Sequence, residues 1–207
     1  MVSQPSAQSR REKKRATRQA LLASARELFA AHGFGGTTTR AVAQRAGVAS
    51  GTVFAHFADK QALLEATLTE QLEEALDDAF ATLPDGDVVS QLVHVCAKLY
   101  AGYAANPSLA RVLVQHSLFA EAPSTRTRTE PPRPLDAQRA RFERWLTQRL
   151  HDAAAQGELV RQQDPQLLFF TVFSLYLSVL VAGLRGDVPF AEQAGFLETL
   201  LRQHIRL

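Results

Sequence analysis

Basic and hydroxyl-bearing side chains are concentrated near the start of the chain. Lysine, arginine and threonine side chains bind phosphate oxygens, so the chemistry they predict is the binding of a polyanion. Residues 1–60 hold ten Lys or Arg against three acids, whereas residues 61–207 hold thirteen against eighteen. This asymmetry favours the N-terminal end as the binding end. The side chains concerned are Arg10, Arg11, Lys13, Lys14, Arg15, Arg18, Thr39, Thr52 and Lys60.

Two short helices are predicted to position the downstream members of this set. The first runs over Thr39–Ala46, a turn follows at Gly47, and the second runs from about Ser50 to Phe57, which is the layout of a helix-turn-helix. Ala43 is small where the two helices cross. Four apolar residues can form a small core with the preceding helix: Val42, Val48, Val53 and Phe57.

The rest of the second short helix is small or polar, which lets a helix enter the major groove of DNA. Its exposed positions are Ser50, Gly51, Thr52 and Ala55. The alternative interpretation is a structural helical hairpin without a ligand, because spacing alone is only moderately specific. The basic stretch just upstream favours DNA.

Residues from about Arg15 to Leu68 resemble the DNA-binding domain of the TetR family. The matching elements, in order, are Leu28–Phe34 with its Gly-Phe turn, Thr38–Ala43, Ala46-Gly47-Val48, Gly51–Phe57 and Asp59–Leu63. The resemblance implies a transcriptional regulator, and a repressor released by an effector is the commoner behaviour in the family. It also implies that these residues contact operator DNA: Thr39, Arg40, Ser50, Gly51, Thr52, Phe54, His56 and Lys60, with Lys13, Lys14 and Arg18 upstream.

Two residues depart from the family pattern. Ala49 stands where a serine usually caps the recognition helix, so we expect Ser50 to take over the cap. Phe54 replaces a tyrosine whose hydroxyl usually reaches a phosphate, so one positioning contact is missing.

The whole chain is predicted to be all-α, with nine helices. Residues 1–12 are expected to be a disordered basic arm, 13–75 the DNA-binding domain with its helix-turn-helix at about 38–57, and 76–207 an effector-binding and dimerisation domain. Gly33 should end the first helix, and Asp59 and Asp136 should cap later ones. Pro165 and Pro189 should open the last two helices, and residues 121–134 should form a mobile loop.

Leu167–Leu184 contains no charged residue. Its length suits a membrane span, but its polar residues and the resemblance favour a buried helix at a homodimer interface, with no membrane partner. An unknown, mostly apolar effector is expected among large residues of the middle helices. These residues, each of which alone is more simply read as core, are Tyr100, Tyr103, His116, Phe119, Trp145, Phe169, Phe173 and Tyr176.

An enzyme is not predicted, because the sequence shows no nucleophile–base pair, metal cluster or phosphate-binding glycine loop. His94 and Cys96 are a poor metal pair, because residues two apart on a helix point in different directions. We therefore expect no metal site and no cofactor. The first residues lack an apolar secretory stretch, so a cytoplasmic location is expected, on bacterial operator DNA when bound.

Overall fold

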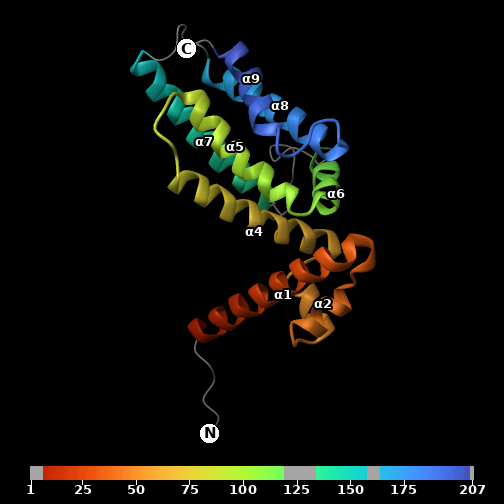
Figure 1. The fold of residues 1–207 in the computed structure, drawn as a ribbon. Coiled ribbons are helices and arrows are strands. Elements are labelled where there is room, and N and C mark those ends of the chain that lie inside the picture. Colours follow the sequence, from red (N-terminus) through yellow and green to blue (C-terminus); the bar gives the residue numbers. More distant parts are fainter. Residues whose placement is uncertain (1–6, 119–133, 158–163, 206–207) are drawn as a thin grey trace.

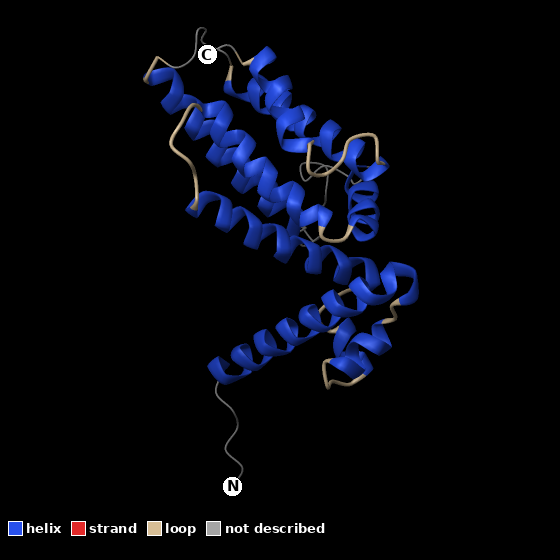
Figure 2. Cartoon of the chain, viewed as in Figure 1, coloured by secondary structure: helices blue, strands red, loops and turns tan. Residues whose placement is uncertain are grey.

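The computed structural model describes residues 7–118, 134–157 and 164–205, and these residues form nine helices without a strand (Figure 2). The all-α architecture is therefore confirmed. Figure 1 shows a small unit containing α1 and α2 on one side of α4, and the helices α5 to α9 on the other side.

The small unit begins with α1, Ala7–Gly36, whose helical geometry is interrupted at Gly33 (φ 67°). The expected end of the first helix at Gly33 is thus correct. The expected disorder of residues 7–12 is wrong, because the helix already starts at Ala7; residues 1–6 lie outside the described residues. Arg, Glu and Lys are good helix formers, and a helix already nucleated by packing extends through them without apolar contacts.

Two short helices follow, α2 (Thr39–Arg45) and α3 (Ser50–Phe54), joined through Gly47 at φ 68°. The helix α3 is shorter than predicted, since Ala55 and His56 form a turn and Phe57 lies beyond it. α4 (Lys60–Ala81) starts at the cap formed by Asp59, whose Oδ1 accepts from Ala62 N at 2.7 Å. The predicted domain boundary at residue 75 falls inside this helix.

The larger unit contains five helices: α5 (Val88–Ala104), α6 (Pro107–Leu118), α7 (Pro134–Ala155), α8 (Pro165–Arg185) and α9 (Gln193–His204). Two predicted boundaries are wrong. Asp136 lies in the first turn of α7 instead of capping it, because the helix starts at Pro134, and α9 starts at Gln193, after a turn that follows Pro189. Residues 119–133, which include Phe119 and nearly all of the predicted loop, lie outside the described residues.

Buried leucines of α4 join the two units. Leu64, Leu68, Leu72 and Leu76, four residues apart, are all nearly inaccessible, and such a stripe buries one helix face. Ion pairs extend the connection: Arg26 of α1 binds Glu70, and Arg141 of α7 binds Glu73 and Asp77. α4 is thereby tied to helices of both units.

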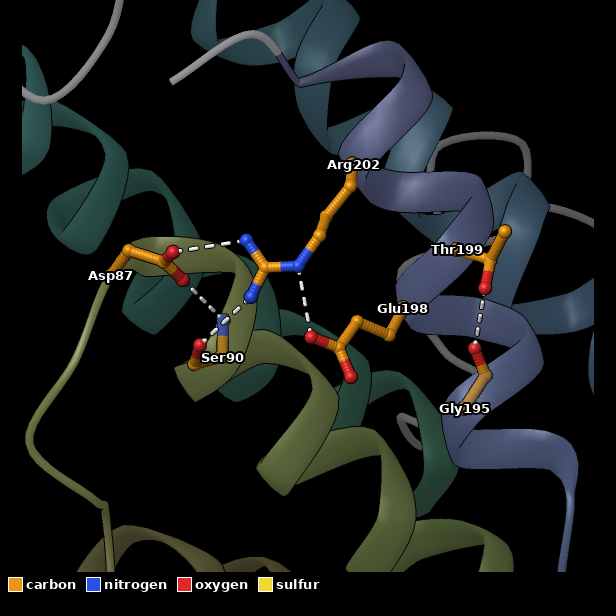
Figure 3. Close-up of polar contacts among 6 residues, drawn as sticks. All are labelled: Asp87, Ser90, Gly195, Glu198, Thr199 and Arg202. Atoms are coloured by element: carbon orange, nitrogen blue, oxygen red, sulfur yellow. Dashed lines mark hydrogen bonds and ion pairs between the residues drawn. The ribbon is translucent and has the colours of Figure 1, made fainter.

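The last two helices approach each other closely at one glycine. A Cβ on Gly183 would overlap the side-chain amide of Gln193, which is fully buried and donates to Val179 O at 2.7 Å. At the far end of α9, Arg202 reaches the start of α5 (Figure 3). These contacts hold α9 against α8 and α5.

Candidate nucleic-acid interface

The helix-turn-helix is held by its apolar residues, and these orient α3. Val42 and Val53 are fully buried, Phe57 is nearly so, and Val48 is half-buried. The neighbouring Phe54 is 57% exposed. Since Val53 faces inward, the opposite face of α3 is presented to solvent, as the sequence predicted.

The turn between α1 and α2 is fixed by two threonines. Thr38 caps α2, with its Oγ1 accepting from Ala41 N at 3.1 Å. The buried Thr37 donates from Oγ1 to Gly33 O at 2.8 Å and Leu28 O at 3.0 Å. Sequence reasoning did not single out Thr37, although carbonyls at a helix end need donors.

The predicted cap at Ser50 is wrong. Ala49 is the N-cap residue of α3 and its side chain makes no cap hydrogen bond, while Ser50 is the first helical residue. A residue already inside the helix points its side chain away from the capping position. The Ser50 side chain therefore remains exposed at the start of α3.

The other predicted contact residues lie at the surface of the same unit. Arg40 and Gly51 are exposed, and Thr39 and Thr52 are half-buried. A Cβ added to Gly51 would meet nothing within 4 Å, so the backbone of α3 is open there. The structure thus brings these four residues together on the two short helices.

A basic stripe on α1 continues this surface. Leu21 and Ala25 are fully buried, and steps of three or four residues back along a helix stay on one face. Those steps lead to Arg18, Lys14 and then Arg10. The guanidinium of Arg18 lies 4.6 Å from the ring centroid of Phe57, so the stripe reaches the end of α3.

His56 stands beside these cations. The pKa of His56 is lowered below its usual 6.5, mainly by partial burial and to a smaller extent by the charges of Lys14 and Arg18. A phosphate bound among these groups would have the opposite effect. Lys14, Arg18 and His56, each predicted singly to contact DNA, therefore lie together in a cluster that suits an anion.

Lys60 has an intramolecular role that the sequence did not reveal. Its Nζ donates to Phe34 O at 2.8 Å and Thr37 O at 3.1 Å and lies 4.2 Å from the Phe34 ring centroid. It thus braces the α1–α2 turn, and a phosphate contact would have to use its remaining N–H.

The predicted effector residues fall into separate places. Tyr100, Tyr103, Phe169, Phe173 and Tyr176 lie together between α5 and α8, with Tyr100 and Tyr176 stacked at 5.1 Å. Trp145 packs instead on Phe80 and Phe142. His116 is partly exposed and its Nε2 lies 3.0 Å from Glu65. In the described part of the chain, no three His, Cys, Asp or Glu residues gather as a metal site.

Comparison with known proteins bears on the helix-turn-helix directly. The sequence model for bacterial regulatory proteins of the tetR family matches residues 21–67, which span the end of α1, α2, α3 and the start of α4. Residues 21–67 therefore carry the DNA-binding domain of the TetR family. This confirms the resemblance drawn from the sequence motifs.

Two curated relatives are similar to part of this chain. They are the HTH-type transcriptional regulator YvkB of Bacillus subtilis (strain 168), 31% identical over 81 residues, and UidR of Escherichia coli (strain K12), 35% identical over 60 residues. The matches span 39% and 29% of this chain, and only 42% and 31% of the relatives' own lengths. The chain is therefore matched over less than half the length of either relative.

Solved structures extend the likeness to the whole fold. A TetR-family regulator from Rhodococcus sp. superposes with a TM-score of 0.67 at 22% identity, covering 92% of this chain and 98% of the other. The FadR repressor of Thermus thermophilus, solved with lauroyl-CoA, gives 0.66 at 23% identity, covering 89% and 92%. At such identities the fold is what is shared.

Proposed function

We propose that this TetR-family protein is a homodimeric regulator of transcription. It represses by holding operator DNA through the small N-terminal unit, in the cytoplasm, and leaves the DNA when a small, mostly apolar effector binds the larger unit. The observation that carries the proposal is the orientation of α3, which buries Val53 and exposes Phe54. A recognition helix must present one face to the major groove in this way.

The proposed dimer surface is the outer face of α8 and α9. Among the described residues, one helical segment, Leu167–Arg185, is long and apolar enough to cross a membrane. Of its most apolar 18-residue stretch, 44% is buried within the protomer. The uncovered remainder is apolar or small, and a second copy covering it would remove it from water. Its exposed members are Leu167, Phe170, Ser174 and Ser178 of α8 and Gly195, Phe196 and Thr199 of α9.

The proposed effector site is the aromatic group between α5 and α8. Buried aromatic side chains with a few polar tips are typical of small-molecule sites. The likeness to the Thermus FadR, solved with lauroyl-CoA, supports a ligand with a long apolar part. Binding of the effector would change the affinity for DNA through α4, which packs on both units.

DNA binding is tested by titrating the protein onto labelled DNA flanking its own gene, at several salt concentrations. We expect tight, salt-dependent binding, and a shallower slope when Lys13 and Lys14 are changed to Gln, because fewer counterions are released. Arg144→Gln, an exposed arginine on α7, is the matched control. Weak binding that is equal on flanking and random DNA would overturn the proposal.

The dimer is tested by light scattering at micromolar concentration. Ser178→Asp places a charge on the proposed interface and should give monomers or unfolded chains. Thr147→Asp, on the exposed face of α7, should leave the dimer intact. A monodisperse monomer for the unmodified protein would contradict this part of the proposal.

A further inference from the structure

Arg139 of α7 is held by aromatic rings instead of a carboxylate. Its guanidinium carbon lies 4.7 Å from the ring centroid of Phe173 and 6.0 Å from that of Phe169, both on α8. The residue is exposed, and no ion pair or hydrogen bond engages its side chain within the part of the chain that the structure describes. Its N–H donors are therefore open to an incoming anion.

Three other arginines that join helices in this protein are paired with carboxylates. Arg26 binds Glu70, Arg141 binds Glu73 and Asp77, and Arg202 binds Asp87. Arg139 makes an interhelical contact of a different kind, to two ring faces. A guanidinium can stack on an aromatic ring while its in-plane N–H groups remain free for a carboxylate or phosphate.

Behind Arg139, an aromatic column leads into the core. The column consists of four rings, with Phe169 and Phe173 5.7 Å apart, Phe173 and Tyr176 6.3 Å apart, and Tyr176 and Tyr100 5.1 Å apart. Phe173 is half-buried, while the other three rings are buried. The column therefore connects an exposed cation with the apolar interior of the larger unit.

The inner end of the column carries no charge. The Tyr100 hydroxyl donates to Tyr176 O at 3.0 Å, and the hydroxyls of Tyr103 and Tyr176 are neighbours. Burial also raises the pKa of Tyr103 to about 12, so its hydroxyl stays neutral. Among the described residues of this column, Arg139 is consequently the partner available to the charged end of a ligand that has one charged and one apolar end.

We infer that Arg139 and Phe173 bind the acidic head of the effector, and that the effector is an amphipathic anion whose apolar body packs against the aromatic column. The head is a carboxylate or a phosphate, because both match the planar donors of a guanidinium. This inference rests on the proposed function and narrows its effector from mostly apolar to apolar and acidic.

The test is calorimetric titration of the full-length protein, without DNA, with three probes of equal chain length: decanoate, decanoyl-CoA and decanol. We expect at least one anion to bind about tenfold more tightly than decanol. Preference for decanoate identifies a carboxylate head, and preference for decanoyl-CoA alone identifies the phosphates. Arg139→Gln should abolish the preference and leave decanol unchanged, whereas Arg144→Gln on the same helix should keep it.

Three outcomes would overturn the inference: equal affinity for anions and decanol, no binding of either anion, or an unchanged preference in Arg139→Gln. A thermal melt establishes that the variant is folded. Operator release is measured separately. An anion that binds through Arg139 without weakening DNA binding would contradict the proposed function and leave this inference standing. Release of the DNA by decanol and decanoate alike would contradict this inference and leave the proposed function standing.

Discussion

Arg202 of α9 donates from Nη1 to Oδ2 of Asp87, 3.0 Å away, at the start of α5 (Figure 3). The other carboxylate oxygen of Asp87 accepts from Ser90 N at 2.7 Å and caps α5. Arg202 also binds Glu198 one turn earlier in its own helix. One carboxylate therefore both starts α5 and fastens α9 to it.

Removing Asp87 should cost more stability than removing Arg202. Asp87→Ala loses the cap, worth about 1–2 kcal/mol, whereas the ion pair is partly exposed and Arg202→Gln should cost about 0.2–1 kcal/mol. Asp87→Ser, which can still cap, should resemble Arg202→Gln. Urea unfolding at a fixed protein concentration measures all three, and a larger loss for Arg202→Gln than for Asp87→Ala would contradict this ranking.

Phe54→Tyr should strengthen DNA binding on operator and random DNA alike. The added hydroxyl can donate to a phosphate, which is worth roughly 1.5–3 kcal/mol per subunit at best, and phosphate contacts do not read sequence. Thr52→Ala should instead lose affinity mainly on the operator if Thr52 reads a base. Matched titrations on both duplexes measure the effects. Weaker binding of Phe54→Tyr to both would place the ring away from DNA.

Protonation of His56 should link DNA binding to pH. Its pKa is lowered in the free protein by partial burial and by Lys14 and Arg18, and a bound phosphate would raise it. DNA affinity should therefore increase as pH falls through the region below 6.5, and His56→Gln should flatten this dependence. Anisotropy titrations from pH 5.5 to 7.5, about one unit either side of the usual histidine pKa, would show it.

Stability of the free protein should respond to His56 with the opposite sign. Its folded pKa lies below the unfolded one, so the unfolded chain binds more protons, and the contribution of His56 to folding weakens as pH falls through 6.5. Thermal melts of the unmodified protein and His56→Gln over the same range should converge in slope above pH 7. Identical profiles at every pH would mean that His56 titrates normally.

Gly183→Ala should loosen the contact between α8 and α9. The new Cβ would displace the Gln193 amide from Val179 O, and overpacking of this kind costs roughly 1–3 kcal/mol. Adding Gln193→Ala should recover part of the loss by removing the overlap. Urea unfolding of the single and double variants tests this, and an additive loss in the double variant would contradict it.

The sequence predicted best where local rules decide the structure. In the small unit, Gly33 and Gly47 lie at helix ends where the backbone needs a positive φ, and Asp59 caps the start of α4. The helical structure of residues 7–12 was not predicted, because a polar helical extension has no apolar periodicity. It is helical because it continues the packed helical turns that follow it. Ser50 was misjudged because a shift of one residue at a helix start decides which side chain caps it.

The grouping of the predicted effector residues could not be derived from a single sequence. Phe169, Phe173 and Tyr176 follow one another along α8, and Tyr100 of α5 stacks on Tyr176. Trp145 and His116 contact other residues. The size of these aromatic side chains predicted that they are buried, but not which residues they contact. The cation on the column, Arg139, carries no sequence signal, because its aromatic partners lie thirty residues or more further along the chain.

The face of α1 that is buried at Leu21 and Ala25 becomes the basic stripe of Arg18 and Lys14 further toward the N-terminus. Folding and the proposed DNA contact thus depend on the same face of α1. A single residue inserted between Arg18 and Leu21 would rotate one half against the other by about 100°, keeping every charge and every core contact while aiming the cations elsewhere. The tolerance of this helix to sequence change therefore differs by kind, because it accepts substitutions along the stripe one at a time but cannot accept a change in length.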